Sequence, residues 1–176
     1  GYNALTANTA SGSGTVPNVA VGHQSQAATT TGTANASLGA WSLDANTTGA
    51  NNTGVGFNAL TNNTTANDNT GLGYNALAAN TTGTGNVAVG ALAIDSNTTG
   101  NNNIGVGKEV LQAVTTGSSN VGVGHQVLYN NTASNNTGVG HNALVANTTG
   151  ASNVALGKSA VDTNTTGSRN TGLGES

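Results

Sequence analysis

Few side chains in this sequence could do chemistry. The 176 residues include no cysteine, three histidines, three basic and six acidic residues. His23, His125 and His141 each follow a glycine of a repeated motif, and the last two stand on neighbouring repeats, where they could stack. Neutral imidazole binds metals well, but a metal site needs several converging ligands, and no carboxylate accompanies these histidines. We therefore expect exposed histidines, no metal site and no other cofactor.

The acidic residues are too widely spaced for catalysis. Asp44, Asp95 and Asp162 share another position of the motif and lie three and four repeats apart. If one repeat advances by one strand spacing, their separation is roughly 14 Å or more, which excludes a general acid–base pair within one chain. Glycine pairs such as Gly122 and Gly124 precede no predicted helix and so do not indicate a phosphate site. The chain is therefore predicted not to be an enzyme.

The element that must position every side chain is a repeat. Asn, three small or aliphatic residues and Gly recur ten times, and the constant step, with one exception that is shorter by a single residue, predicts a solenoid in which each repeat is one turn. Stacked turns would align the asparagines as an amide ladder. We number repeat positions from this asparagine, which occurs at Asn18, Asn35, Asn52, Asn69, Asn86, Asn103, Asn120, Asn136, Asn153 and Asn170.

Positions 2 to 4 predict a short strand, because a β-branched residue, a small residue and a larger aliphatic residue alternate. Gly at position 5 is expected to end the strand with a backbone angle that other residues resist, and positions 7 to 9 are expected to be extended again. Positions 2, 4 and 9 are predicted to form the buried core, weaker in the first turn, where Gln26 stands at position 9. The core members at positions 4 and 9 are Val21, Leu38, Val55, Leu72, Val89, Val106, Val123, Val139, Leu156 and Leu173, then Leu60, Leu77, Leu111, Leu128 and Leu144.

Position 3 holds only Gly, Ala or Ser, and small side chains permit close approach of another backbone. We predict that this face packs against partner coils, which would offset a thin core; the alternative is that small residues only ease a tight bend. The predicted interface comprises Gly54, Gly71, Ala88, Gly105, Gly122 and Gly138.

The predicted architecture is therefore an all-β parallel β-solenoid with one turn of about 17 residues per repeat. Residues 1–176 form a single repetitive segment of about ten turns, with an inserted surface bulge near residues 9–17. The residue missing between Gly124 and Asn136 falls in a loop, so the strand register should survive. Both ends stop within a repeat, which indicates a fragment of a longer fibre.

The composition limits the kinds of partner that the chain is expected to bind. Charged residues make up 5% of the chain, against about 25% in ordinary soluble domains. With no basic stripe, binding to a nucleic-acid backbone is not expected. No apolar run approaches the roughly 20 residues of a membrane span, so this segment is not predicted to insert into a membrane.

The run from Asn69 to Gly83, Asn-Thr-Gly-Leu-Gly-Tyr-Asn-Ala-Leu-Ala-Ala-Asn-Thr-Thr-Gly, resembles the repeats of large bacterial and phage-related surface fibres. Those fibres carry an Asn-Thr-Ala-Val-Gly-Tyr-x-Ala-Leu-x-x-Asn-Thr-Thr-Gly pattern, often ahead of an endosialidase-type chaperone. The pattern is also similar to the head repeats of trimeric autotransporter adhesins. This resemblance implies a left-handed β-roll, a homotrimer or filament, and a place on the surface of a cell or virion.

The Asn-Thr-Thr-Gly bends raise two further hypotheses. They match the N-glycosylation sequon, for example at Asn46, Asn80, Asn97 and Asn147, and exposed bends would accept sugar. Threonines that align in columns along the stacked turns also suggest ice binding, although adjacent threonines on an extended chain point to opposite sides. The columns are Thr47, Thr64, Thr81, Thr98, Thr115, Thr132, Thr148 and Thr165, beside Thr48, Thr65, Thr82, Thr99, Thr116, Thr149 and Thr166.

These observations favour a structural or adhesive role as the rigid shaft or head of an extracellular fibre. Its partners would be copies of itself and a cell-surface or glycan receptor, bound through many weak repeated sites. Ice binding by the threonine columns is the alternative from another functional class.

Overall fold

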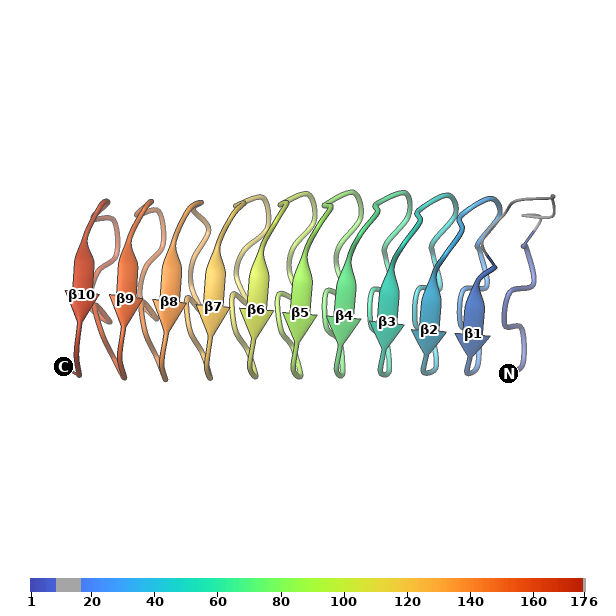
Figure 1. The fold of residues 1–176 in the computed structure, drawn as a ribbon, viewed down its shortest axis with the longest axis horizontal. Coiled ribbons are helices and arrows are strands. Elements are labelled where there is room, and N and C mark those ends of the chain that lie inside the picture. The colour runs from blue at the N-terminus through green and yellow to red at the C-terminus, as the bar shows by residue number, and fades with distance from the viewer. Residues whose placement is uncertain (9–16, 176) are drawn as a thin grey trace.

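The structure is a computed structural model that describes residues 1–8 and 17–175, so the expected bulge near residues 9–17 lies outside the described part except for Pro17. No described residue is helical. The chain forms one parallel sheet whose strands follow sequence order (Figure 1). The strands are β1 (Val19–Val21), β2 (Ala36–Leu38), β3 (Thr53–Val55), β4 (Thr70–Leu72), β5 (Val87–Val89), β6 (Ile104–Val106), β7 (Val121–Val123), β8 (Thr137–Val139), β9 (Val154–Leu156) and β10 (Thr171–Leu173).

The register of the sheet confirms the parallel β-solenoid. Each strand pairs with the next so that equivalent repeat positions lie opposite each other, as Thr53 pairs with Thr70. The short repeat does not disturb the pairing, since Val121 of β7 still pairs with Thr137 of β8. One repeat is therefore one turn of the coil, and the missing residue is absorbed in a loop, as predicted.

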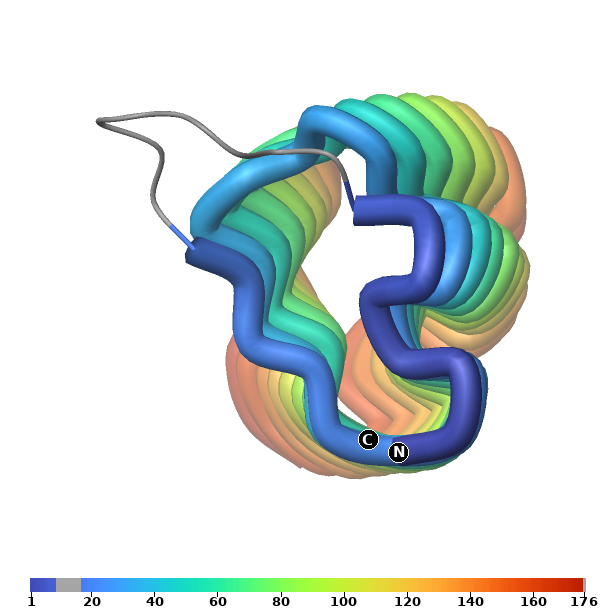
Figure 2. The backbone as a smooth tube through the Cα atoms, turned by 90° about the vertical axis from the view of Figure 1, so that its right-hand side faces the viewer, coloured from blue at the N-terminus to red at the C-terminus, as the bar shows by residue number. Residues whose placement is uncertain are grey.

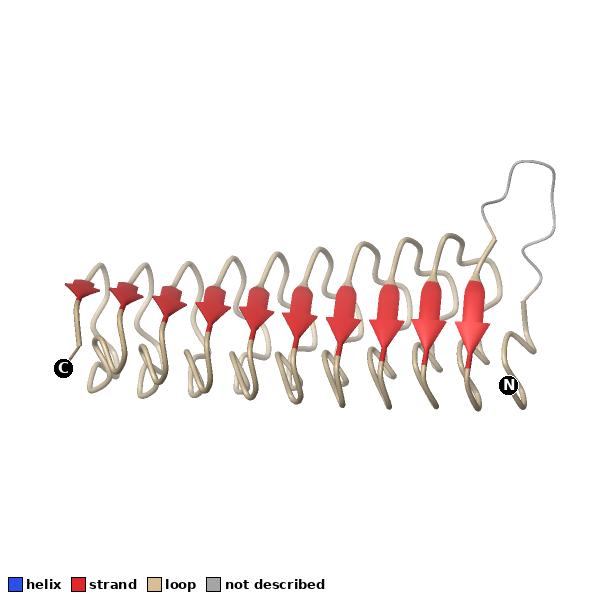
Figure 3. Cartoon of the chain, turned by 60° about the horizontal axis from the view of Figure 1, so that its bottom comes forward, coloured by secondary structure: helices blue, strands red, loops and turns tan. Residues whose placement is uncertain are grey.

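Figure 2 shows the coil along its axis, with successive turns superimposed. The chain circulates counter-clockwise as it recedes from the N-terminus, which is the sense of a left-handed coil. The strands form one side of the cross-section, and turns make up the remaining sides (Figure 3). Gly at position 5 closes the corner after each strand. Gly73, for example, has a φ of +139°, and a Cβ atom there would lie 2.5 Å from Gly90 O.

The predicted core was wrong at positions 2 and 4, because these side chains point outward. The position 4 residues of the predicted core are exposed or half-buried: Val21, Leu38, Val55, Leu72, Val89, Val106, Val123, Val139, Leu156 and Leu173. A two-residue alternation establishes which side chains share a face, but not which face is inside. The coil interior is narrow, and larger residues fill it from the opposite wall.

The predicted interface at position 3 was also wrong, because Gly54, Gly71, Ala88, Gly105, Gly122 and Gly138 line the interior of the coil. Where the buried residue at position 8 is valine, the neighbouring position 3 residues are glycine. A Cβ atom on Gly122 would lie 2.6 Å from Val110 Cγ2, whereas Ala88 packs in the core with Ala76 and Ala93. Small residues at position 3 therefore make room inside one chain and are not open to a second one.

Position 9 supplies the apolar core as predicted, since Leu60, Leu77, Leu111, Leu128 and Leu144 are fully buried. The backbone around them differs from the prediction. Positions 7 and 9 adopt left-handed angles instead of an extended strand, with a φ of +53° at Asn75 and +52° at Leu77. This pair of tight turns directs the leucine inward. Ile94 adopts a φ of +50° at the same position, which is unusual for a β-branched residue.

The predicted asparagine ladder at position 1 is present. Asn52 donates its backbone N–H to Asn35 Oδ1 at 2.9 Å, and its Nδ2 donates to Asn35 Oδ1 at 3.1 Å and to Ala66 O at 2.8 Å. The side chain therefore ties the strand both to the previous turn and to the bend of its own turn.

A second asparagine ladder was not predicted. The asparagine that opens each Asn-Thr-Thr-Gly bend is turned inward, and Asn80 Nδ2 donates to Asn63 Oδ1 at 2.9 Å and to Gly83 O at 3.0 Å. The ladder comprises Asn46, Asn63, Asn80, Asn97, Asn131, Asn147 and Asn164. Val114 interrupts it, and Asn97 Oδ1 is left buried without a hydrogen-bond partner.

The first turn has a polar interior, where Gln26 takes the place of the usual leucine. Gln26 is fully buried, and its Nε2 donates to Val19 O and to Ser37 Oγ, both at 2.8 Å. Hydrogen bonds from Gln26 Nε2 thus take the place of apolar packing in this turn, while Gln26 Oε1 is buried without a hydrogen-bond partner.

Candidate functional site

Two surfaces contain every large hydrophobic side chain that is exposed among the described residues. Ten of these side chains lie at positions 2 and 4 of the strands: Val19, Val21, Leu38, Leu72, Ile104, Val106, Val123, Val154, Leu156 and Leu173. The other three are Tyr2, Phe57 and Tyr74, which lie along one corner of the coil. A coil of almost uncharged residues thus concentrates its exposed apolar groups in two bands.

We call the first band the outer face, defined by the position 2 and position 4 side chains of β1 to β10. Position 4 is Val or Leu in every strand, position 2 is Val, Ile, Thr or Ala, and no charged residue interrupts either row. Ten strands at the usual spacing make a strip roughly 43 Å long. Exposure is substantial, at 48% for Leu156 and 44% for Leu72. Contiguous apolar patches of several hundred Å² mark interaction surfaces.

We call the second band the ring stripe, which comprises Tyr2, His23, Trp41, Phe57 and Tyr74. Four of the rings stand at position 6 of their turns, and Trp41 at position 7 fills the turn whose position 6 is Ala40. Neighbouring ring centroids are 5.6, 5.2, 5.1 and 5.9 Å apart, so each ring contacts the next. The Trp41 Nε1–H donates to Gln24 Oε1 of the preceding turn.

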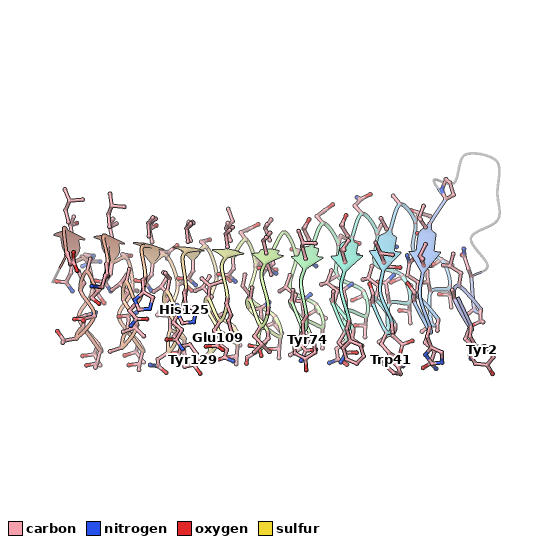
Figure 4. All side chains as sticks on the ribbon, turned by 90° about the horizontal axis from the view of Figure 1, so that it is seen from below. Tyr2, Trp41, Tyr74, Glu109, His125 and Tyr129 are labelled. Atoms are coloured by element: carbon pink, nitrogen blue, oxygen red, sulfur yellow. The ribbon has the colours of Figure 1, made fainter. Side chains whose placement is uncertain are left out.

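The ring stripe faces away from the outer face. In Figure 4 the strands lie along one edge of the coil, and the labelled Tyr2, Trp41 and Tyr74 lie along the opposite edge. Of the residues at position 6, only the histidines entered the sequence prediction, as exposed side chains. The missed signal was the run of aromatic residues in successive repeats, which includes a tryptophan displaced by one position.

The same corner of the C-terminal turns is ionic. Lys108 pairs with Glu109 at 3.0 Å, and Lys158 pairs with Glu175 at 2.7 Å. His125 and His141 stack with centroids 5.4 Å apart, as their neighbouring repeats suggested. The described residues contain no cluster of three or more side chains that could hold a metal ion.

The acidic residues at position 10 do not converge. Burial raises the pKa of Asp44 above its ordinary value, and the nearby His23 partly opposes the shift. Burial also raises the pKa of Asp95, against hydrogen bonds from Gln112 and Ser96. These are single, half-buried carboxyl groups on separate turns, and the described surface has no pocket around them.

The Asn-Thr-Thr-Gly bends differ from the sequence hypotheses in one respect. Asn46, Asn80, Asn97 and Asn147 are fully buried, so these sequons do not present their amides as expected. The two threonine columns also have different environments. The threonines at position 14 are exposed, as at Thr82, whereas those at position 13 are mostly half-buried, and their hydroxyls donate to the next turn, as Thr81 Oγ1 does to Thr98 O at 3.0 Å.

Comparison with protein-family models, with curated proteins and with solved structures gives no match. Among the described residues, no helix is long and apolar enough to cross a membrane.

Proposed function

We propose that this chain is a rigid structural segment of an extracellular fibre, in which copies of the chain assemble side by side through the outer face. Three copies, the number implied by the resemblance to surface fibres and adhesin heads, would bury three apolar strips along a common axis. The rod would hold an attachment site away from the cell or virion that bears it.

The outer face is the observation that supports this proposal. Its two rows of aliphatic and threonine side chains run the whole length of the sheet without a charge, and Val106 and Val123 are each 38% exposed. Covering them with a second copy would stabilise the assembly by about 25 cal/mol for each Å² of apolar surface removed from water. The rows of side chains on one copy would contact the same rows on another copy along the whole sheet, because every turn repeats positions 2 and 4.

The coil also suits a load-bearing role. Adjacent strands bond throughout the sheet, and both asparagine ladders link turn to turn, as in the 2.8 Å bond from Asn97 Nδ2 to Asn80 Oδ1. Few backbone groups are left for a protease to engage without opening several turns. Resistance to proteolysis and stiffness are the properties that a shaft needs.

Sedimentation equilibrium tests the assembly. We expect wild type to sediment as three chains, and a double variant with Val106→Lys and Val123→Lys to sediment as one folded chain, because lysines from every copy would meet. Thr99→Lys with Thr116→Lys is the matched control, since it adds the same charge on exposed positions away from the outer face. A wild-type chain that stays a folded monomer at micromolar concentration would contradict the proposal.

Ice binding remains the alternative that the sequence raises, and we do not adopt it. A flat ice-binding surface needs two equivalent ranks of free hydroxyls, and most hydroxyls of the inner threonine rank are engaged in bonds between turns. Thermal hysteresis at millimolar protein concentration would revive this alternative.

A further inference from the structure

The ring stripe is a second exposed apolar band that the proposed assembly leaves uncovered. Side-by-side packing through the outer face would place the strands at the centre of the fibre and the ring stripe on its outside (Figure 4). Tyr2 is 73% exposed, Tyr74 53% and Phe57 43%. Exposed aromatic residues are enriched where proteins bind partners.

We propose that the ring stripe binds a neutral linear polysaccharide of extended β-1,4-linked pyranose rings, which lies parallel to the fibre axis. This inference gives the proposed adhesive role a ligand class, and it rests on that role only for its biological meaning. The binding surface itself needs a single chain.

The parallel rings at the two ends of the stripe leave part of their faces open to such a ligand, whereas Trp41 between them is inclined by 74° to His23 and by 78° to Phe57. The Tyr2 and His23 rings are inclined by only 12°, with centroids 5.6 Å apart, and the Phe57 and Tyr74 rings by 19°, with centroids 5.9 Å apart. Parallel rings in contact are separated by about 3.5–4.0 Å, so each pair is offset sideways by roughly 4 Å and leaves part of each face open. The apolar C–H groups of a pyranose ring pack well on the electron-rich face of an aromatic ring.

The spacing of the rings favours a sugar polymer over a peptide. The rings stand on successive turns, so they advance along the coil by about 4.8 Å per turn, a step similar in length to one pyranose unit of an extended chain. The centroids are 5.1 to 5.9 Å apart because neighbouring rings are also displaced sideways. An extended peptide presents side chains on one face at intervals of about 6.6 Å, and a polyproline II helix at intervals of about 9 Å. Neither peptide repeat matches the spacing of the rings over several turns.

The surroundings are those of a neutral polar ligand. Position 7 beside the rings carries the amides Gln24, Asn58 and Asn75. Gln24 Oε1 already accepts from Trp41 Nε1 and Asn75 Oδ1 is buried, so the Gln24 Nε2–H and the Asn58 amide are the groups that can bond sugar hydroxyls. The described surface has no pocket, which suits a long ligand that lies along the coil and not a small molecule. Asp44 lies near His23 of the stripe, and the ion pairs of this corner begin at Lys108, beyond Tyr74.

The single tryptophan of the chain lies in the middle of the ring stripe, so its fluorescence reports binding there. We would titrate the protein with cellohexaose, xylohexaose and chitohexaose, and measure retardation in gels that contain hydroxyethyl cellulose. The expected result is a saturable change in Trp41 fluorescence with at least one hexasaccharide. Phe57→Ala and Tyr74→Ala should each weaken binding by about tenfold, the effect of removing one stacking ring from a nucleic-acid platform.

His141→Ala is the matched control, because it removes a ring from position 6 in the ionic half and should leave the affinity unchanged. The Val106→Lys, Val123→Lys variant should still bind the sugar, so failure of the assembly and failure of the ring stripe are distinguishable. The inference is overturned if none of the three hexasaccharides changes the fluorescence or the mobility, if Phe57→Ala with Tyr74→Ala binds as wild type does, or if a proline-rich peptide saturates the stripe instead.

Discussion

Val114→Asn should repair the interrupted asparagine ladder. Val114 is fully buried between Asn97 and Asn131, and Asn97 Oδ1 is buried without a partner. On the preceding turn, Asn97 Nδ2 donates to Asn80 Oδ1 at 2.8 Å, which is the geometry that a new asparagine would adopt. Its Nδ2 would reach Asn97 Oδ1, and its Oδ1 would accept from Asn131 Nδ2.

The free-energy change follows from opposing contributions. Relief of an unpaired buried oxygen contributes about 1–3 kcal/mol, and one additional hydrogen bond about 1 kcal/mol. Loss of the buried valine side chain costs about 1.5–3 kcal/mol. We therefore expect Val114→Asn to raise the free energy of unfolding by about 1 kcal/mol, although it places a polar residue in the core.

Urea denaturation at fixed protein concentration measures this change, and two variants sharpen it. The side chain introduced by Val114→Asp has nearly the same shape as the one introduced by Val114→Asn, but it has no N–H to donate to Asn97 Oδ1. Val114→Asp should therefore lower the free energy of unfolding strongly at pH 7. Asn80→Val removes three hydrogen bonds of the ladder and should cost about 2 kcal/mol. If Val114→Asn lowers the free energy of unfolding as much as Asn80→Val does, the ladder does not stabilise the coil as we argue.

Three further predictions concern single turns of the coil. Ile94→Leu should stabilise the coil by about 0.5–1 kcal/mol in urea titrations, because a β-branched residue at a φ of +50° is strained; destabilisation would contradict this. Gly122→Ala should cost about 1–3 kcal/mol, because its Cβ would lie 2.6 Å from Val110 Cγ2, and Val110→Ala should rescue it; additive effects would refute the contact. Burial raises the pKa of Asp95 above 3.8, so its stabilising contribution is complete below the unfolded pKa and is lost as the pH rises through the folded pKa. Asp95→Asn should therefore raise the Tm at pH 7 but not at pH 3, and an equal effect at both would exclude ionisation as the cause.

The period of the sequence was sufficient to predict the coil, because every turn places Asn and Gly at the same two positions. Parallel strands in register and the ladder at position 1 follow from that period. The Asn-Thr-Thr-Gly segment was predicted to be an exposed bend, because turn-forming residues do not reveal that Asn80 and its equivalents point inward.

The inside and outside of the strand were exchanged in the prediction. Val or Leu at position 4 is a stronger hydrophobic signal than Gly or Ala at position 3, so size favoured the wrong face. The deciding fact is the narrow interior, where Leu77 enters from the opposite wall through left-handed angles at positions 7 and 9. No propensity predicts leucine in that conformation, because only the surrounding turns enforce it.

The ring stripe was missed for a related reason. Trp41 stands one position away from the other rings, and a position-by-position comparison of the repeats therefore places Ala40 in the row. Only the three-dimensional arrangement shows that Trp41 fills the space between His23 and Phe57.

Thiol labelling tests most directly the claim that the outer face is open on one chain and covered in the fibre. The sequence contains no cysteine, so Val106→Cys and Thr116→Cys each introduce a single thiol. We predict that the labelling rate of the thiol at residue 106 falls steeply as protein concentration rises, while the labelling rate of the thiol at residue 116 stays constant. Equal labelling rates at both sites over the whole concentration range would contradict it.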